Sequence, residues 1–209
     1  MRIFPISLLP YLAAMTLVVV ASNYLVQIPF DYFGLKDILT WGAFTYTIAF
    51  LVNDLTNRRF GVKAARIVIG LGFALAVVLS IWLATPRIAI ASGTAFAVAQ
   101  LLDASIFDRL RASQWWRAPL ISSVLGSVID TVIFWSLAFA PLFAGIDLAF
   151  GMEDGSLGFP VPFFGGETAL WISLAFGDFC VKILVGLAML LPYGLLLPLL
   201  AKQQAQPAS

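Results

Sequence analysis

Six long apolar runs constrain the fold of this sequence more than any other feature. A helix needs about 20 mostly apolar residues to cross the roughly 30 Å hydrocarbon core of a bilayer. Runs of this kind lie at 8–28, 38–54, 64–84, 88–107, 118–142 and 169–200. They are continuous, unlike the alternating strands of about 10 residues that build a transmembrane β-barrel. The sequence therefore predicts an all-α polytopic membrane protein with six transmembrane helices in one domain, 1–209.

The composition agrees with this prediction and excludes several classes of protein. Hydrophobic residues make up 61% of the chain and charged residues 11%, where a soluble domain carries about 25% charged residues. The 12 basic and 11 acidic residues nearly cancel, so no nucleic-acid surface is expected. Histidine is absent and Cys180 is the one cysteine. The sequence thus offers neither the usual zinc ligands nor a disulfide framework, and we expect no metal and no cofactor.

Two of the runs allow a second interpretation. The first resembles a secretory signal peptide, because Arg2 precedes an apolar stretch that ends in Val20-Ala21-Ser22. A membrane span is favoured there, since Asn23-Tyr24-Leu25-Val26-Gln27 and five further runs follow. In the last run, Pro192 predicts a kink or an early stop of the helix near Leu191.

The lysines and arginines lie mostly at one side of the predicted bundle. Nine of them fall in connections or ends on that side: Arg2, Arg58, Arg59, Lys63, Arg66, Arg109, Arg111, Arg117 and Lys202. Only Lys36 and Arg87 lie on the other side, where Arg87 is expected to extend toward the membrane surface. Because cytoplasmic connections carry the excess of Lys and Arg, both termini are predicted to be cytoplasmic.

The connection at about 143–168 is predicted to be external. It contains four acidic residues and no basic one, and it is rich in Gly, Pro and Phe. One interpretation is a loop anchored in the membrane interface by its aromatic side chains. The other is a lid over an outward-facing cavity.

Charged residues inside the runs point to function. These residues are Asp54, Asp103, Asp130, Asp178 and Lys182. Each costs about 2.5–3.5 kcal/mol at the centre of a bilayer, so the five together would cost on the order of 15 kcal/mol. They must therefore be paired, hydrated or protonated, and must face one another or a cavity.

The positions of these charges leave alternatives open. Asp178 and Lys182 are four residues apart on one helix, which suits a neutralised pair that assists insertion or a binding pair. Small residues beside Asp130, such as Ser122 and Gly126, favour close helix packing. The small-residue stripes on the fourth and fifth spans also allow a homodimer. Trp41 suits either an interface belt or a binding site.

Motifs for enzymatic chemistry are absent from the sequence. No GxSxG, no GxGD-type aspartyl context and no GxxxxGK[ST] phosphate loop is present. We therefore expect no enzyme and no intrinsic ATP hydrolysis. A polar cluster within six helices is the pattern of a carrier or binder of small solutes.

Several motifs resemble a known family over nearly the whole chain, apart from 143–168. They are Ser22-Asn23-Tyr24-Leu25-Val26-Gln27, Thr40-Trp41-Gly42-Ala43-Phe44, Asp54-Leu55-Thr56 with Arg59-Phe60-Gly61, Ala99-Gln100-Leu101-Leu102-Asp103, Phe107-Asp108-Arg109-Leu110-Arg111, Trp115-Trp116-Arg117-Ala118-Pro119, Asp130-Thr131, Asp178 with Lys182, and Leu191-Pro192-Tyr193-Gly194. These segments resemble the YhhQ/VUT family of queuosine precursor transporters in the bacterial inner membrane. One departure is Asn53, where a small polar residue such as Thr is expected.

The resemblance implies uptake of 7-cyano-7-deazaguanine and 7-aminomethyl-7-deazaguanine, and the residues suit that chemistry. One carboxylate can accept both N–H donors of a guanine-type edge. An amide or lysine can donate to its carbonyl, and an aromatic face such as Phe44 or Tyr46 can stack on its ring. The candidate binding residues are Asn23, Gln27, Trp41, Phe44, Asp54, Gln100, Asp103, Asp130, Asp178 and Lys182.

Three questions stay open at this point. Uptake can be coupled to protons through a buried carboxyl, or can be facilitated diffusion with trapping inside the cell. The chain can also be a substrate-binding membrane subunit that depends on a separate ATPase module, or a membrane scaffold. The carboxylate that binds the guanine edge is not identified.

Overall fold

The structure is a computed structural model in which residues 6–25, 28, 30–33 and 39–205 are described. Helices account for 79% of it, which confirms the predicted helical fold. Gln27 and Lys36 lie outside the described residues, as do Arg2 and the rest of the first five residues. A short 3₁₀ turn, η1 (Ile6–Leu8), precedes the first helix.

Five helices follow the predicted runs closely: α1 (Leu9–Leu25), α4 (Val62–Leu83), α5 (Pro86–Leu110), α6 (Arg117–Phe139) and α8 (Leu170–Ala205). The last four contain segments that are long and apolar enough to cross a membrane. In α1 the corresponding apolar segment, Leu9–Ser22, is shorter. The six-span count therefore stays a prediction.

The second predicted span is broken into two helices, α2 (Trp41–Tyr46) and α3 (Ile48–Phe60), which meet at Thr47. Threonine hydroxyls before the break and at it donate to carbonyls of α2: Thr45 to the oxygen of Gly42 at 3.2 Å and Thr47 to that of Ala43 at 3.1 Å. Such bonds compete with the regular helical ladder and bend helices. In membrane proteins a broken helix is tolerated where it is buried in protein or lines a cavity.

Local sequence explains how two neighbouring helices begin. Gly61 separates α3 from α4 with φ of 85°, a left-handed conformation that glycine adopts without strain. Thr85 caps α5, because its hydroxyl accepts the Ile88 N–H at 3.4 Å, and Pro86 occupies the first helical position.

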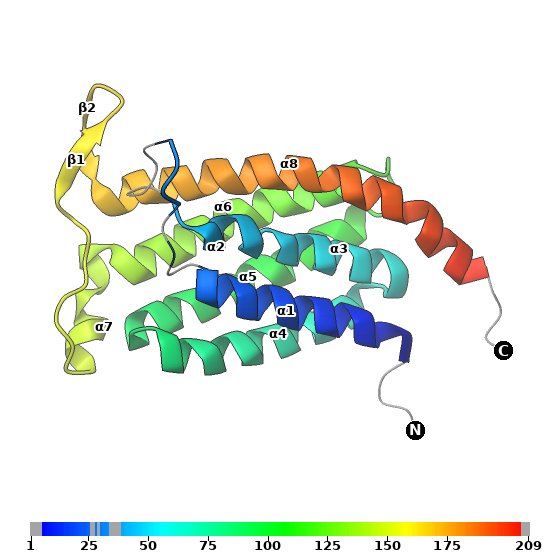
Figure 1. Cartoon of the computed structure of the whole chain (residues 1–209), viewed down its shortest axis with the longest axis horizontal. Coiled ribbons are helices and arrows are strands. Elements are labelled where there is room, and N and C mark those ends of the chain that lie inside the picture. Colours follow the sequence, from blue (N-terminus) through cyan, green and yellow to red (C-terminus); the bar gives the residue numbers. More distant parts are fainter. Residues whose placement is uncertain (1–5, 26–27, 29, 34–38, 206–209) are drawn as a thin grey trace.

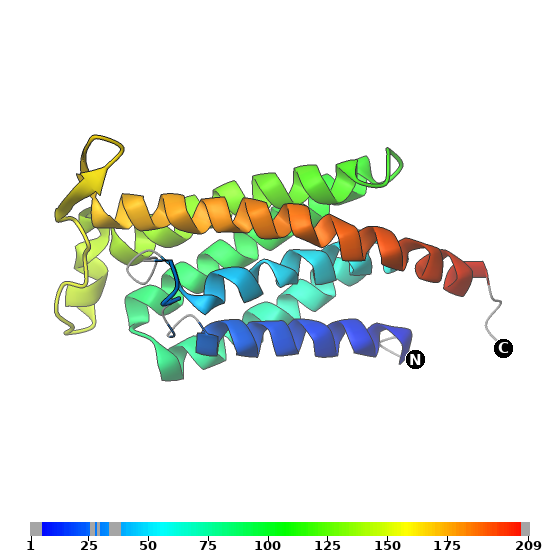
Figure 2. The same cartoon turned by 45° about the horizontal axis from the view of Figure 1, so that its top comes forward.

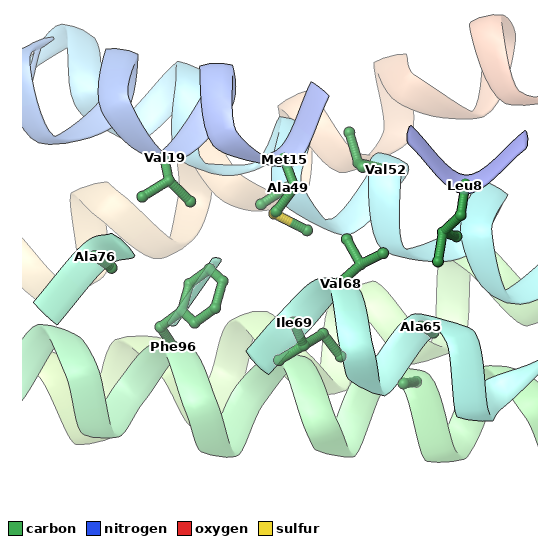
Figure 3. Close-up of a cluster of buried hydrophobic side chains, with 11 residues drawn as sticks. Leu8, Met15, Val19, Ala49, Val52, Ala65, Val68, Ile69, Ala76 and Phe96 are labelled. Atoms are coloured by element: carbon green, nitrogen blue, oxygen red, sulfur yellow. The ribbon is translucent and has the colours of Figure 1, made fainter. Parts of the chain in front are cut away.

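The apolar core lies between α1, α3, α4 and α5 (Figure 3). Its buried members are Leu8, Met15, Val19, Ala49, Val52, Ala65, Val68, Ile69, Ala76, Phe96 and Ala104. The packing of α5 relies on small residues, since Ala91, Ala95 and Ala99 are at most 1% exposed. This predicted stripe is therefore used inside the chain to bring helices together.

The connection between α6 and α8 has structure of its own. It contains η2 (Pro141–Phe143), α7 (Ala144–Ala149) and an antiparallel hairpin of β1 (Pro160–Phe163) and β2 (Gly166–Ala169). The hairpin turn places Phe164 and Gly165 at φ of 45° and 84°, and positive φ at both central residues is typical of two-residue hairpins. These short elements are a local departure from the all-α prediction.

The hairpin and α7 lie at one end of the bundle. The N-terminal end of α1 and the C-terminal end of α8 lie at the other (Figures 1 and 2). Helix α8 continues through Pro192 and Pro198 to Ala205, so the predicted early stop near Leu191 is wrong. Instead, α8 bends in its C-terminal part (Figure 1), and the helix continues beyond each proline.

Candidate functional site

A cavity of about 310 Å³ opens between α2, α5, α6 and α8. Its walls are mostly apolar, with contributions from Ala95 and Phe96 of α5 and from three aromatic residues of α6, namely Phe134, Trp135 and Phe139. The charged lining residues are Asp130, Asp178 and Lys182, and Tyr46 stands beside them. A largely apolar cavity with a few grouped polar residues is typical of small-molecule sites.

Lys182 links the two carboxylates of this cavity. Its Nζ lies 2.7 Å from Asp130 Oδ2 and 2.5 Å from Asp178 Oδ2, and the lysine side chain is 4% exposed. Its Nζ also lies 5.5 Å from the centre of the Tyr46 ring. One ammonium between two carboxylates leaves a net charge of −1 when all three groups are ionised. The predicted Asp178–Lys182 pair is thus part of a larger group that includes α6.

The two carboxylates differ in their remaining hydrogen-bonding capacity. Asp130 uses both oxygens, because Tyr46 donates its hydroxyl to Oδ1 at 2.8 Å while Lys182 binds Oδ2. Asp178 accepts from Thr131 at 3.1 Å, from Trp135 Nε1 at 3.2 Å and from Lys182, all through Oδ2. Among the described residues no donor reaches Asp178 Oδ1. Asp178 lines the cavity, so this oxygen is the acceptor of the carboxylate that has capacity for a further donor.

A second polar group is buried between α3, α5 and α6. Asn53 donates to Asp103 Oδ2 at 2.7 Å, and the carboxyls of Asp54 and Asp103 interact directly, with Ser122 beside both. Gly126 of α6 permits this packing: a Cβ there would lie 2.7 Å from the Phe50 ring and 3.4 Å from the Asp103 Cβ. The predicted packing role of small residues beside Asp130 is consistent with these contacts.

Several buried atoms of this second group lack hydrogen-bond partners within the described part of the chain. They are Asn53 Oδ1, Asp54 Oδ1, Asn57 Oδ1, Gln100 Nε2 and Oε1, Asp103 Oδ1 and Tyr193 Oη. An unsatisfied buried polar atom costs about 1–3 kcal/mol. Seven of them in one region therefore indicate that an additional species, such as protons or water, belongs there.

The structure separates the sequence-predicted site residues into groups. Asp130, Asp178 and Lys182 come together at the cavity, whereas Asp54, Gln100 and Asp103 belong to the second polar group and do not line the cavity. Trp41 and Phe44 pack with Phe30 in an aromatic cluster, with ring centroids 4.9 and 5.2 Å from that of Phe30. The cavity lining includes their neighbours Thr40, Gly42 and Ala43 instead.

The side chains of two predicted site residues are not among those that the structure describes. Asn23 belongs to α1, but the placement of its side chain is not described, and Gln27 lies outside the described residues. The preceding residue, Ser22, lines the cavity and donates to the Thr45 hydroxyl at 3.1 Å. The end of α1 therefore does reach the cavity.

Sequence reasoning missed Thr131 and Trp135 as members of the charged group. They are four residues apart on α6, so both reach Asp178 from one face of the helix. This four-residue spacing is the sequence signal that could have identified them, because Thr131 directly follows Asp130. Tyr46, which sequence reasoning considered as an aromatic face only, contributes its hydroxyl as well.

Arg87 corrects an expectation about the external side. It does not extend toward the membrane surface, because it is 1% exposed and has partners at every nitrogen. Its Nη1 lies 2.8 Å from Asp147 Oδ2 and 3.0 Å from the Ser156 hydroxyl, while Nε and Nη2 donate to the carbonyls of Leu137 and Ala140 at 2.8 and 2.5 Å. Arg87 therefore ties the 143–168 connection to the ends of α5 and α6.

Asp154 lies on the same connection and is exposed. The Ser156 hydroxyl and N–H donate to its carboxylate, and Arg87 stands 3.6 Å away. These contacts hold the pKa of Asp154 below its usual value, with the Ser156 hydroxyl as the largest cause. Asp154 is thus kept ionised beside the buried arginine.

Comparisons with known proteins agree with this architecture. The model of a family described as "Putative vitamin uptake transporter" matches residues 40–85 and 80–196. The queuosine precursor transporter of Escherichia coli (strain K12) is 36% identical over 211 residues, which cover 90% of this chain and 86% of that protein. No solved structure gives a significant match.

A second relative extends the similarity. The protein named "Probable queuosine precursor transporter" of Haemophilus influenzae is 32% identical over 218 residues, covering 89% of this chain and 84% of that protein. Both relatives are therefore matched over most of their length. The chain is a multi-pass inner-membrane protein, and it belongs to the vitamin uptake transporter family.

Proposed function

We propose that this chain takes up 7-cyano-7-deazaguanine and 7-aminomethyl-7-deazaguanine across the bacterial inner membrane. In this proposal the chain crosses the membrane six times, with α1 and the pair α2–α3 as the two spans besides α4, α5, α6 and α8. Both termini are cytoplasmic. Two relatives that carry the name of queuosine precursor transporters support the substrate class.

The observation that carries the proposal is the free Oδ1 of Asp178 at the wall of the cavity. A guanine-type edge presents two parallel N–H donors, and a carboxylate is their matching acceptor. Asp178 is held in place by Thr131, Trp135 and Lys182 through its other oxygen. The binding carboxylate is thereby oriented before a ligand arrives, which reduces the entropic cost of binding.

The remaining walls suit a flat bicyclic ring. A cavity of about 310 Å³ lies at the lower end of the range for small-molecule pockets. Phe96, Phe134 and Trp135 offer aromatic faces for stacking. The net charge of −1 on Asp130, Lys182 and Asp178 favours the cationic aminomethyl form, whereas the neutral nitrile form depends on hydrogen bonds and stacking.

A binding panel with purified protein tests the site. Guanine, both deazaguanines and the queuine base are titrated against the wild type, Asp178→Asn and the exposed control Glu153→Gln. A charged hydrogen bond contributes about 1.5–3 kcal/mol, so Asp178→Asn is expected to weaken binding of the deazaguanines at least about tenfold. Glu153→Gln should bind as the wild type does. Equal affinity in all three proteins would contradict the assignment.

Uptake into liposomes that contain only this protein tests the transport step. Accumulation or exchange of labelled deazaguanine by the purified chain alone is the expected result. Binding without any transport would instead identify a substrate-binding subunit that needs a separate ATPase module. Failure to bind any compound of the panel would leave the scaffold interpretation.

A further inference from the structure

The carboxyls of Asp54 and Asp103 form a buried acidic pair that the proposed substrate site does not use. Asp54 is 2% exposed and Asp103 is 0% exposed. They interact directly, and the side chains beside them are Asn53, Ser122 and Ser123, all uncharged. No ion pair reaches either carboxyl within the described residues.

Charged groups on the surrounding helices are directed elsewhere. On α3 and at the end of α5, Arg58 and Arg111 donate to each other's main-chain carbonyls. On α4, Arg66 lies at an exposed position near Ser105, 3.5 Å from its hydroxyl. On α8, Lys182 is occupied by Asp130 and Asp178, and Tyr193 is the titratable residue that interacts with Asp54.

This arrangement requires a proton. Two adjacent ionised carboxylates with no cation beside them among the described residues would place two like charges in a medium of low dielectric constant. Such pairs hold one proton between them, as in the carboxyl pairs of aspartic proteases. An amide that donates to one member, as Asn53 does to Asp103, favours a state in which Asp103 accepts and Asp54 carries the proton.

A small cavity lies beside Asp54, one member of this pair. Its volume is about 10 Å³, and its lining includes Asp54, Ser123, Tyr193 and Thr47. That is roughly the space one water molecule needs. The Tyr193 hydroxyl, which has no hydrogen-bond partner in the described structure, lines the same small cavity as Asp54. Asp54, this cavity and Tyr193 therefore offer a route by which a proton can reach or leave the pair.

The acidic pair is mechanically connected to the substrate cavity. Phe50 packs against Tyr46, with ring centroids 6.3 Å apart, and against Gly126, which also contacts Asp103. Tyr46 in turn donates to Asp130 at the cavity. Thr47, where α2 ends and α3 begins, lies between Tyr46 and Phe50. A shift of α2 on ligand binding would therefore move Phe50 and change the packing around the pair.

We propose that Asp54 and Asp103 form a proton-binding site that couples substrate uptake to the proton gradient. The proposal rests on the proposed transport function. The O–H bond of the carboxyl forms with a proton taken from water on the outer side, and it breaks when that proton passes to water on the inner side. The pair thus carries one proton per cycle, and the substrate occupies the separate cavity at Asp178.

Purified protein in liposomes distinguishes coupling from substrate recognition. Labelled 7-cyano-7-deazaguanine is supplied with and without an imposed pH gradient, acidic outside. The proteins compared are the wild type, Asp54→Asn, Asp103→Asn and the matched control Asp108→Asn, which lies half-buried near the end of the same helix as Asp103. Asparagine has the shape of a protonated aspartate, so the buried variants are expected to fold.

The expected result separates two activities. Wild type and Asp108→Asn accumulate substrate several-fold above equilibrium, and a proton uncoupler abolishes the accumulation. Asp54→Asn and Asp103→Asn keep equilibrium exchange of substrate across the membrane but do not accumulate it. Gradient-driven accumulation by both buried variants, or wild-type transport that is indifferent to the gradient, would overturn the proposal.

An infrared measurement gives a readout that needs no substrate. The C=O stretch of a protonated carboxyl is expected in wild type at neutral pH and in Asp108→Asn, and it should be lost when both carboxyls of the pair are replaced, in Asp54→Asn with Asp103→Asn. Absence of this band in wild type would overturn the proton site. If the wild type neither binds nor exchanges deazaguanine while the band is present, the proposed substrate fails and the proton site stands.

Discussion

At the scale of single residues, the cavity is organised by one lysine that neutralises only one of its two carboxylates. Lys182 holds Asp130 and Asp178 on its two sides, and the other oxygens of these aspartates have different surroundings. Tyr46 occupies that of Asp130, and no described donor occupies that of Asp178. The two aspartates therefore differ in the hydrogen-bonding capacity that they have left, although both were predicted for the same site.

We expect Asp130→Asn and Asp178→Asn each to abolish precursor uptake while the protein still inserts into the membrane. Asp178→Asn removes the acceptor for the ligand, and Asp130→Asn removes the partner that positions both Lys182 and Tyr46. Uptake is measured in cells beside membrane levels of each variant, with Glu153→Gln as the control. Wild-type uptake by both well-inserted variants would show that this cluster is not the site.

The sequence predicted part of this residue cluster for a clear physical reason. Asp178 and Lys182 share one helix, so their spacing of four residues alone places them together. Asp130 lies 52 residues from Lys182, and Tyr46 lies 84 residues from Asp130. Local spacing does not show which faces of different helices pack together. The separation of Asp54 and Asp103 from Asp130 could therefore not be predicted from the sequence either.

At the scale of elements, the 143–168 connection is held by a buried ion pair. Arg87 and Asp147 have side chains 1% and 4% exposed, and they lie 60 residues apart in sequence. The predicted interpretations of the connection were an anchored loop and a lid. The structure shows a segment fixed to the ends of α5 and α6 through Arg87, with the exposed Phe164 at its tip.

Arg87→Gln is expected to destabilise the protein by about 3–5 kcal/mol, because it leaves the carboxylate of Asp147 buried without a cation. Thermal unfolding of the purified protein in detergent measures the loss. Replacing both partners, as Arg87→Met with Asp147→Leu, should recover much of it, since apolar pairs often replace buried ion pairs without net cost. An unchanged stability of Arg87→Gln would show that the contact contributes little.

The breaks in the helices differed in how well they could be predicted. Pro192 is a strong local signal, yet α8 continues through it, because neighbouring helices in a membrane tolerate the lost hydrogen bond. The break at Thr47 has only threonine hydroxyls as its local signal, and such residues also occur in unbroken helices. Tertiary packing decides both cases.

At the scale of the whole molecule, the positions of the basic residues and of the chain ends are both consistent with the predicted orientation. The outer ends of α1 and α8 lie at the end opposite the hairpin (Figure 1). Arg58 and Arg111 are joined at a connection between helices far from the hairpin. The apolar runs predicted the helical fold and the four long helices α4, α5, α6 and α8, because helix length in a membrane is set by the bilayer rather than by tertiary contacts.

Single cysteines in a Cys180→Ser background test the orientation. A membrane-impermeant maleimide is expected to label a cysteine at position 153 in intact cells whose outer membrane is made permeable. A cysteine at position 114 should react only after the inner membrane is opened. The reverse pattern would invert the predicted topology, and labelling of both sites in intact cells would disagree with six spans.

The uneven distribution of charge around the cavity limits what the protein can distinguish. All its charged lining residues belong to α6 and α8, whereas the wall formed by α4 and α5 consists of Ala76, Ser92, Ala95 and Phe96. If a ring is bound by one edge at Asp178, this uncharged wall offers few polar contacts to the rest of it. We therefore expect the held edge to provide most of the selectivity, with the net charge of −1 adding a preference for a cationic substituent. Plain guanine, which shares the edge, should compete with either precursor.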